Sequence, residues 1–209
     1  MTTDPKIAIG RVPLGKVDVD KLLSDDFAVV MPVNSVMIVN ASKDARFCEI
    51  LGKYHTTVDG QVLKWLVNTK EGGRLIPKTS GSSLVFDLLS RLQGTGRTVM
   101  LIGGSKTNNA LACARISESY GVDVQGLSPM VSASGVADDE DALLESIAQA
   151  RPDVLLVAFG APKQEFWIDR VGKVLRAVDG QAVEHVPVQP VVVVQKARDA
   201  HFVAVGHGC

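Results

Sequence analysis

The stretch from Asp153 to Trp167 reads DVLLVAFGAPKQEFW and decides the fold. After Asp153 it runs without a polar residue through Phe159, which is the length of a buried strand, and its second half begins a helix. Gly160 permits a tight turn between the two, and Pro162 suits a first helical turn, where its missing N–H costs nothing. An apolar strand that feeds a helix in this way is typical of a parallel sheet that is buried on both faces.

The same strand–helix unit occurs further upstream. The run TVMLI at 98–102 predicts a second buried strand, which ends in Gly103-Gly104 and is followed by a helix over about 106–120. A shorter strand is expected at 122–125 and another near 56–58. This alternation predicts a single Rossmann-like α/β domain whose mostly parallel central sheet is covered by helices on both faces.

The carboxyl edge of that sheet is where we expect a ligand, because open α/β sheets bind ligands beyond the carboxyl ends of their strands. Three segments are therefore site candidates: 103–106, 160–164 and the residues after 56–58. In the second of these, Lys163, Gln164 and Glu165 are expected to project at a helix N-terminus beside unpaired amides, which suits a phosphate or a sugar hydroxyl. The alternative is an ordinary strand–helix turn with a solvated, charged start.

Composition limits the class of protein. The 209 residues are 46% hydrophobic, which is enough for one well-buried core. A net charge of −1 and an aromatic content of 5% argue against nucleic-acid binding. Cys48, Cys113 and Cys209 lack metal-ligand spacing and favour free thiols in a reducing compartment. With no secretory pattern and no apolar run near the roughly 18 residues of a membrane span, we expect a cytoplasmic protein.

The string GAPKQEFWI at 160–168 closely resembles the signature of the bacterial N-acetylmannosaminyltransferase family, glycosyltransferase family 26, which acts in the assembly of teichoic acid, enterobacterial common antigen and capsule or exopolysaccharide. Asn34, Asp44 and the Asp59-Gly60 pair resemble, in the same order, the family's asparagine, mid-helix aspartate and Asp-Gly pair. LIGG at 101–104 resembles its strand-ending glycines. The resemblance covers about residues 28–170.

The resemblance implies an inverting transfer of N-acetylmannosamine or a related hexose from a UDP-sugar to a sugar on polyprenyl diphosphate. Asp59 would be the catalytic base, since an ordinary aspartate with a pKa of about 3.9 is ionised at pH 7 and accepts a proton from the acceptor hydroxyl. Asn34 and Gln164 would bind sugar or nucleotide through their amides, and Lys78 would hold the diphosphate. The remaining predicted substrate-binding residues are Gly60, Gly81, Gly103, Gly104, Gly160, Pro162, Lys163 and Glu165.

The resemblance also implies what surrounds the reaction. No cofactor, metal or nucleic acid is expected. The chain would act at the inner face of the plasma membrane, with peripheral membrane contact and a homo-oligomer as further expectations. Asp18-Val-Asp20 has the spelling of a metal-binding glycosyltransferase motif, but its place before any recognisable sheet favours a helix cap.

Two positions depart from the family pattern. KTSGSSL at 78–84 stands where the family usually shows Arg-x-x-Gly-x-Asp-Leu, so Lys78 replaces an arginine and Ser83 an aspartate. Lysine keeps the charge but loses the bidentate fork. A catalytically degenerate homologue that only binds a nucleotide sugar therefore stays open. An NAD-dependent oxidoreductase is less favoured, because the third glycine after Gly103-Gly104 is missing and Asp123 lies near the start of its strand.

The resemblance ends near residue 175. We expect a glycosyltransferase domain over 1–175 and a divergent tail over 176–209 that packs on the same domain. Within the tail, Pro187 and Pro190 flank an apolar run that is expected to form an edge strand at 191–194, and 201–205 is a candidate for another.

Overall fold

The computed structural model describes residues 7–25, 27–70, 76–177 and 191–194. Its strands are β1 (Ile7–Ile9), β2 (Val12–Leu14), β3 (Ala28–Val33), β4 (His55–Val58), β5 (Thr98–Gly103), β6 (Asp123–Leu127), β7 (Val154–Ala158) and β8 (Val191–Val194). Its helices are α1 (Val19–Ser24), α2 (Ser35–Lys43), α3 (Ala45–Lys53), α4 (Gln61–Lys70), α5 (Gly81–Leu92), α6 (Lys106–Tyr120), α7 (Glu140–Ala150) and α8 (Lys163–Ala177).

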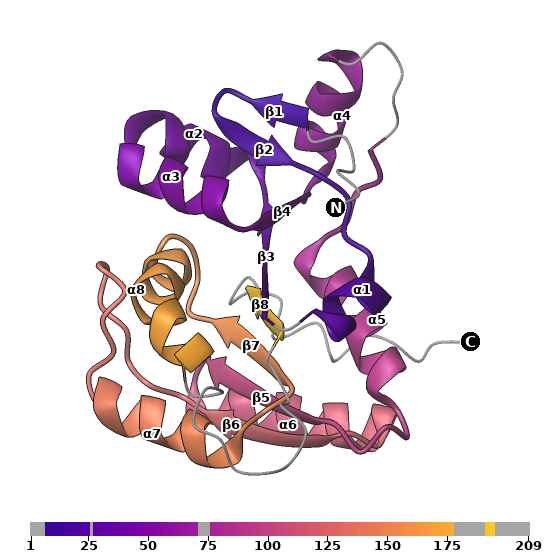
Figure 1. The fold of residues 1–209 in the computed structure, drawn as a ribbon, viewed down its shortest axis with the longest axis vertical. Helices are drawn as coiled ribbons and strands as arrows, with labels where there is room; N and C mark the ends of the chain where they lie inside the picture. The colour runs from indigo at the N-terminus through magenta and orange to yellow at the C-terminus, as the bar shows by residue number, and fades with distance from the viewer. Residues whose placement is uncertain (1–6, 26, 71–75, 178–190, 195–209) are drawn as a thin grey trace.

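One parallel sheet organises the molecule. Within the described ranges it has six strands in the order β4-β3-β8-β7-β5-β6, and all neighbouring strands run parallel. β1 and β2 form a separate antiparallel hairpin, which is tied to the sheet by a parallel bridge from Gly15 to Thr57. The prediction of an α/β fold with a mostly parallel sheet is confirmed (Figure 1).

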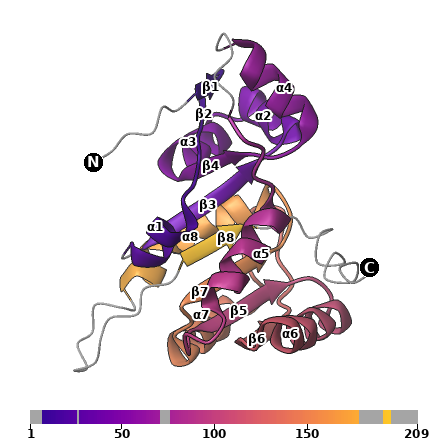
Figure 2. The same cartoon turned by 90° about the vertical axis from the view of Figure 1, so that its right-hand side faces the viewer.

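Apolar side chains alternate between the two faces of this sheet and build a core on each. In β5, Val99 and Leu101 join the core under α1, α5 and α6, whereas Met100 and Ile102 join the core under α2, α3, α4, α7 and α8. Figure 2 shows α5 and α8 on opposite sides of the strands. Helices thus cover both faces, as predicted, and the continuous apolar strands follow from burial on both sides.

The position of β8 differs from the prediction. The run 191–194 was expected at an edge, but β8 pairs with β3 on one side and β7 on the other (Figure 1). Four consecutive valines suit a central strand that is covered on both faces, and the run itself contains no proline that would remove a ladder donor. Pro187, Pro190 and the candidate strand 201–205 lie outside the described residues, and the division near residue 175 stays a prediction.

Candidate functional site

The carboxyl edge of the sheet brings the predicted site residues into two groups. Asn34 and Asp59 follow the neighbouring strands β3 and β4. Gly103 ends β5, and Gly160 lies two residues beyond the neighbouring strand β7. All three candidate loops therefore lie at one edge of the sheet. The two groups are separated by β8, which places β3 and β7 about 10 Å apart at the usual strand spacing.

In the first group, the ends of β3 and β4 are joined directly. The Asp59 N–H donates to the Val33 carbonyl at 2.7 Å, so Asp59 is held beside Asn34, the next residue after β3. Both side chains are half-buried. Asn34 caps α2, because its Oδ1 accepts the N–H of Met37 at 3.1 Å. The cap uses the amide oxygen, so the NH2 end of Asn34 is the group that could donate to a ligand.

The segment before α5 is fastened to the end of β4. The Thr79 N–H donates to the Val58 carbonyl at 2.9 Å, and Thr57 Oγ1 donates to the Thr79 carbonyl at 2.9 Å. These two bonds bring Lys78 and Gly81 to the edge where Asp59 lies. Lys78 is exposed, whereas Gly81 is the buried first residue of α5. The anchoring role of Thr57 and Thr79 was missed, although the density of hydroxyl side chains around 79–83 is a usable signal.

Ser83 is used by the helix cap of α5. Ser80 Oγ accepts the Ser83 N–H at 3.2 Å and lies 2.7 Å from Ser83 Oγ. In the position where the sequence resemblance predicts an aspartate, this chain therefore has a short hydroxyl that is engaged with its own helix start.

In the second group, Gly103 and Gly104 differ in whether the surrounding structure leaves room for a side chain. A Cβ on Gly103 would lie 2.5 Å from the Ala158 carbonyl oxygen, so only glycine permits this approach of β5 to β7. Gly104 faces open space. Asn109 holds this end of β5 in place, because its Nδ2 donates to the carbonyls of Leu101, Gly103 and Leu127 at 2.9–3.1 Å. Nothing in the sequence pattern distinguishes Asn109 from other polar residues of α6.

The expectation that Gln164 and Glu165 project from an open helix end is wrong. Gln164 is only 3% exposed and Glu165 is 0% exposed. The helical period puts both on the inner side of α8 with Trp167 and Ile168, which are fully buried. Burial is possible because the polar groups pair: Gln164 Oε1 accepts the Gly160 N–H at 2.9 Å, and Gln164 Nε2 donates to Glu165 Oε1 at 3.0 Å. Their assignment as substrate-binding residues stays a prediction.

Lys163 is held by the loop that connects β6 to α7. Its Nζ donates to the Val131 carbonyl at 3.1 Å, and Arg170 Nη2 donates to the Gly135 carbonyl at 2.6 Å. A Cβ on Gly135 would lie 2.6 Å from the Trp167 nitrogen, so this loop packs closely on the first turns of α8. Pro162, half-buried, follows a cis peptide bond and accepts the Phe166 N–H at 3.1 Å. The interactions of this loop were not predicted.

Two carboxyl groups near α8 have opposite pKa shifts. Burial raises the pKa of Glu165 to about 7, although the hydrogen bond from Gln164 acts in the other direction. The Arg170 guanidinium, hydrogen-bonded to Glu140, lowers the pKa of that carboxyl. The first carboxyl is buried and accepts a hydrogen bond from Gln164, and the second belongs to an ion pair that fastens α7 to α8.

The competing motifs take the structural roles that the sequence favoured. Asp18 caps α1, where its Oδ1 accepts the N–H groups of Asp20 and Lys21 at 3.0 and 3.3 Å. Asp123 is the first residue of β6, at the amino end of that strand. Cys48 and Cys113 are free thiols, and Cys209 lies outside the described residues. The described residues include no group of three or more side chains that could hold a metal ion.

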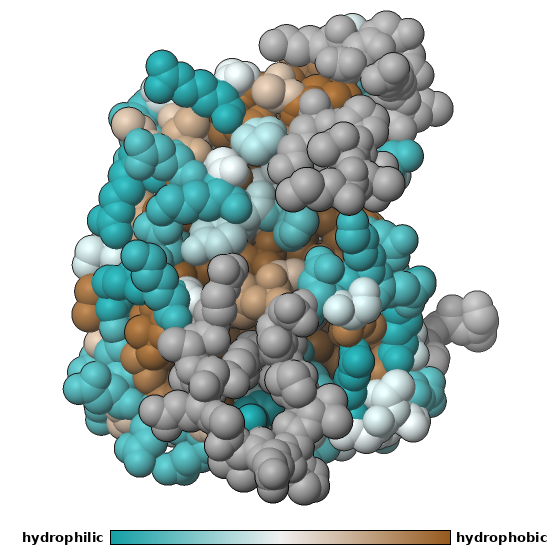
Figure 3. Space-filling model, viewed as in Figure 1, coloured by the Kyte–Doolittle hydropathy of each residue, from teal (hydrophilic) through white to brown (hydrophobic). Residues whose placement is uncertain are grey.

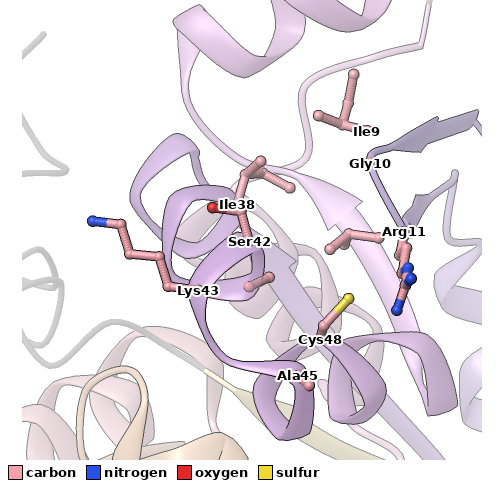
Figure 4. A pocket seen from close by; sticks show the side chains of 10 residues that line it. Ile9, Gly10, Arg11, Ile38, Ser42, Lys43, Ala45 and Cys48 are labelled. Carbon is pink, nitrogen blue, oxygen red and sulfur yellow. The ribbon is translucent and has the colours of Figure 1, made fainter.

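A pocket of about 490 Å³ lies away from both groups of predicted residues. It is bounded by the β1–β2 turn, the second half of α2 and the start of α3, and Figure 4 shows the Lys43 side chain extending away from it.

Hydrophilic side chains gather over α2 and α3 on the face shown in Figure 3. In the part of the chain that is described, no helix has the length and apolar character needed to cross a membrane.

Comparison with known proteins gives a consistent assignment. Residues 16–180 match the Glycosyl transferase WecG/TagA/CpsF family. An N-acetylglucosaminyldiphosphoundecaprenol N-acetyl-beta-D-mannosaminyltransferase of Bacillus subtilis (strain 168) is 25% identical over 142 residues, which are 68% of this chain and 54% of the relative. The protein of the same name from Bacillus spizizenii (strain ATCC 23059 / NRRL B-14472 / W23) is 24% identical over 144 residues, with the same coverage. The chain spans about half the length of these relatives. Since the family match extends over most of its residues, the chain belongs to the Glycosyl transferase WecG/TagA/CpsF family.

Proposed function

We propose that this chain transfers N-acetylmannosamine, or a related hexose, from a UDP-sugar to a sugar on polyprenyl diphosphate, with inversion at the anomeric carbon. The observation that carries the proposal is the meeting of Asp59, Asn34 and the 78–81 segment at the ends of β3 and β4. Family membership supports sugar transfer, and the relatives' name describes an N-acetylmannosaminyl transfer to an undecaprenyl-diphosphate sugar.

Asp59 acts as the general base in this proposal. Its carboxylate accepts the proton of the acceptor hydroxyl while the hydroxyl oxygen attacks the anomeric carbon. The bond between that carbon and the donor diphosphate oxygen breaks, and uridine diphosphate leaves. Lys78 and the backbone amide of Gly81 stabilise the negative charge that develops on the diphosphate.

The second group of residues would bind the rest of the donor. Gly104 faces open space, so a ligand can approach its backbone on this side of β8 without meeting a Cβ, whereas the Gly160 N–H is already bound by Gln164. An elongated ligand such as a nucleotide sugar suits two binding groups at one edge. Because the acceptor is a membrane lipid, we also propose peripheral contact with the inner face of the plasma membrane. We further propose that the protein forms a homo-oligomer.

A donor screen with product analysis tests the reaction. The protein is incubated with UDP-N-acetylmannosamine or other UDP-hexoses and a sugar on a polyprenyl diphosphate, and products are identified by mass and by anomeric configuration. The proposal expects one disaccharide on the lipid carrier, with the new linkage inverted relative to the donor. Retention of configuration, or hydrolysis of the donor without product, contradicts it.

Asp59→Asn tests the base. The amide keeps the shape of the side chain but accepts no proton, so turnover should fall by about 10²–10⁴ while the Kd for uridine diphosphate stays nearly unchanged. Turnover is measured on the lipid acceptor, and the Kd by calorimetric titration. Near-wild-type turnover in Asp59→Asn removes Asp59 from the mechanism.

A degenerate homologue is the second candidate, and the cap at Ser80–Ser83 favours it. This chain has a serine in the cap where the sequence resemblance predicts a carboxylate, and a lysine where it predicts an arginine. Such a protein binds uridine diphosphate but forms no product with any acceptor. Parallel titration with NAD separates both candidates from an oxidoreductase.

A further inference from the structure

A short chain of hydrogen bonds runs from the turn after β7 into the protein interior. Gln164 Oε1 accepts the Gly160 N–H at 2.9 Å, and Gln164 Nε2 donates to Glu165 Oε1 at 3.0 Å. The backbone closes the same ring, because the Gln164 N–H donates to the Gly160 carbonyl at 3.3 Å. The turn that carries Gly160 is thus fastened to α8 through one side-chain amide.

The orientation of that amide depends on Glu165. A carboxamide has an acceptor at one end and two donors at the other, in nearly the same shape. Glu165 offers an acceptor at Oε1, so the NH2 of Gln164 faces inward and its oxygen faces Gly160. The flipped amide would set an NH2 group against the Gly160 N–H, and two donors would then face each other without an acceptor.

Glu165 itself is out of reach of a substrate in this conformation. Its exposed fraction is 0%, and its Oε2 has no hydrogen-bond partner among the described residues. Burial disfavours the charged form of this carboxyl and raises its pKa, which agrees with a role as a hydrogen-bond acceptor rather than as a negative charge.

We infer that Glu165 is a positioning residue, which holds the Gln164 amide in the orientation that fixes Gly160 and the turn 159–162 at the carboxyl end of β7. The consequence for donor binding rests on the proposed function, because the donor is placed at this edge of the sheet. The consequence for the Gly160 amide does not.

Four variants test the inference. Glu165→Met removes the acceptor but keeps the length of the side chain, and Glu165→Gln keeps an acceptor oxygen. Gln164→Glu sets two carboxylates against each other. The double variant Gln164→Glu/Glu165→Gln reverses the chain: the new carboxylate accepts from the Gly160 N–H and also from the new amide at position 165.

Two measurements are made on each variant: hydrogen exchange of the Gly160 amide by NMR, and the Kd for uridine diphosphate by calorimetry. Glu165→Met and Gln164→Glu should speed hydrogen exchange of the Gly160 amide. They should also raise the Kd for uridine diphosphate by at least about fivefold, the effect of one lost hydrogen bond. Exchange of the Leu156 amide in β7 should stay as in the wild type, which distinguishes a local change from general destabilisation. Glu165→Gln and the double variant should keep Gly160 exchange within about twofold of the wild type.

Unchanged Gly160 exchange in Glu165→Met overturns the inference. So does a double variant that exchanges as fast as Gln164→Glu alone. If Glu165→Met does not fold, the comparison of Gln164→Glu with the double variant decides, because both keep polar side chains of the original size. Failure of the wild-type protein to bind uridine diphosphate contradicts the proposed function, while Gly160 exchange still decides the role of Glu165.

Discussion

Gln164 and Glu165 show how far the identity of a residue predicts its role. Their place in the GAPKQE string pointed to this turn, and the structure confirms that the turn lies at the carboxyl edge of the sheet. The direction of the two side chains could not be predicted, because a charged helix start normally faces water. Whether Glu165 is exposed or buried depends on its contact with Gln164, which only the folded chain creates.

The buried carboxyl of Glu165 should make stability depend on pH. Its pKa is raised to about 7, above the value of about 4.3 in an unfolded chain. Between these values the folded state retains a proton that the unfolded state has lost, so its contribution is greatest below pH 4.3 and is lost as the pH rises to about 7. The loss is on the order of 3 kcal/mol.

Urea unfolding of the wild type and Glu165→Gln from pH 4.5 to 8 measures this dependence. The amide does not titrate, so the free energy of unfolding of the wild type minus that of the variant should decrease as the pH rises through the same range. Subtraction removes the titration of all other groups. A difference that stays constant with pH would show that the carboxyl is not buried as described.

Lys78 supplies the cation that the proposed function places at the donor diphosphate. If the 78–81 segment holds the donor diphosphate, Lys78→Ala should lower the affinity for uridine diphosphate by roughly 10- to 100-fold, and the loss of affinity should be smaller at high salt. Lys78→Arg should retain or improve binding, because arginine pairs with two phosphate oxygens at once. Uridine, which lacks phosphates, is the control ligand and should bind both variants equally. An equal loss for uridine and its diphosphate assigns Lys78 to the fold.

At the scale of elements, the strong periodic segments were predictable and the weak ones were not. The helix expected over 106–120 matches α6, and the strand expected at 98–102 matches β5 to within one residue. The β1–β2 hairpin was missed, because strands of three residues are too short to show a period. α4 was missed as well, since its buried residues, Leu63 and Val67, lie between exposed apolar side chains such as Val62 and Trp65.

Asn34 caps α2 and, in the proposed function, also binds the donor, and two substitutions distinguish these roles. Asn34→Asp keeps the oxygen that caps α2 but loses the NH2 group, so stability should hold while affinity for the donor falls. Asn34→Ala should lose both, with about 1 kcal/mol of stability. Asp18→Ala, which removes the cap of α1, is the matched control: similar destabilisation and unchanged affinity, measured by urea unfolding and calorimetry. Full affinity in Asn34→Asp would leave Asn34 with its cap alone.

At the scale of the whole molecule, the order of strands is what the sequence could not supply. Parallel strands and helices on both faces follow from the apolar runs, but pairing partners depend on contacts between distant parts of the chain. β3 and β7 are more than a hundred residues apart, and β8 joins them. The two groups of predicted site residues share one sheet edge because of this strand. The prolines near 191–194 indicated an edge strand, whereas the four valines are typical of a central strand. The valines were the better indicator of the position of β8.

The central position of β8 predicts the effect of a proline within it. Val192 lies in register with Val29 of β3 and with Leu155 of β7. Val192→Pro removes the backbone N–H and fixes φ near −65°, away from the value of about −120° for a parallel strand, so it should cost ~3 kcal/mol or more. Val192→Ile keeps the N–H and the branched Cβ and should cost less than about 1 kcal/mol. Urea unfolding compares the two. If Val192→Pro is as stable as Val192→Ile, then β8 contributes no pairing to the sheet, and β3 and β7 must be joined in another way.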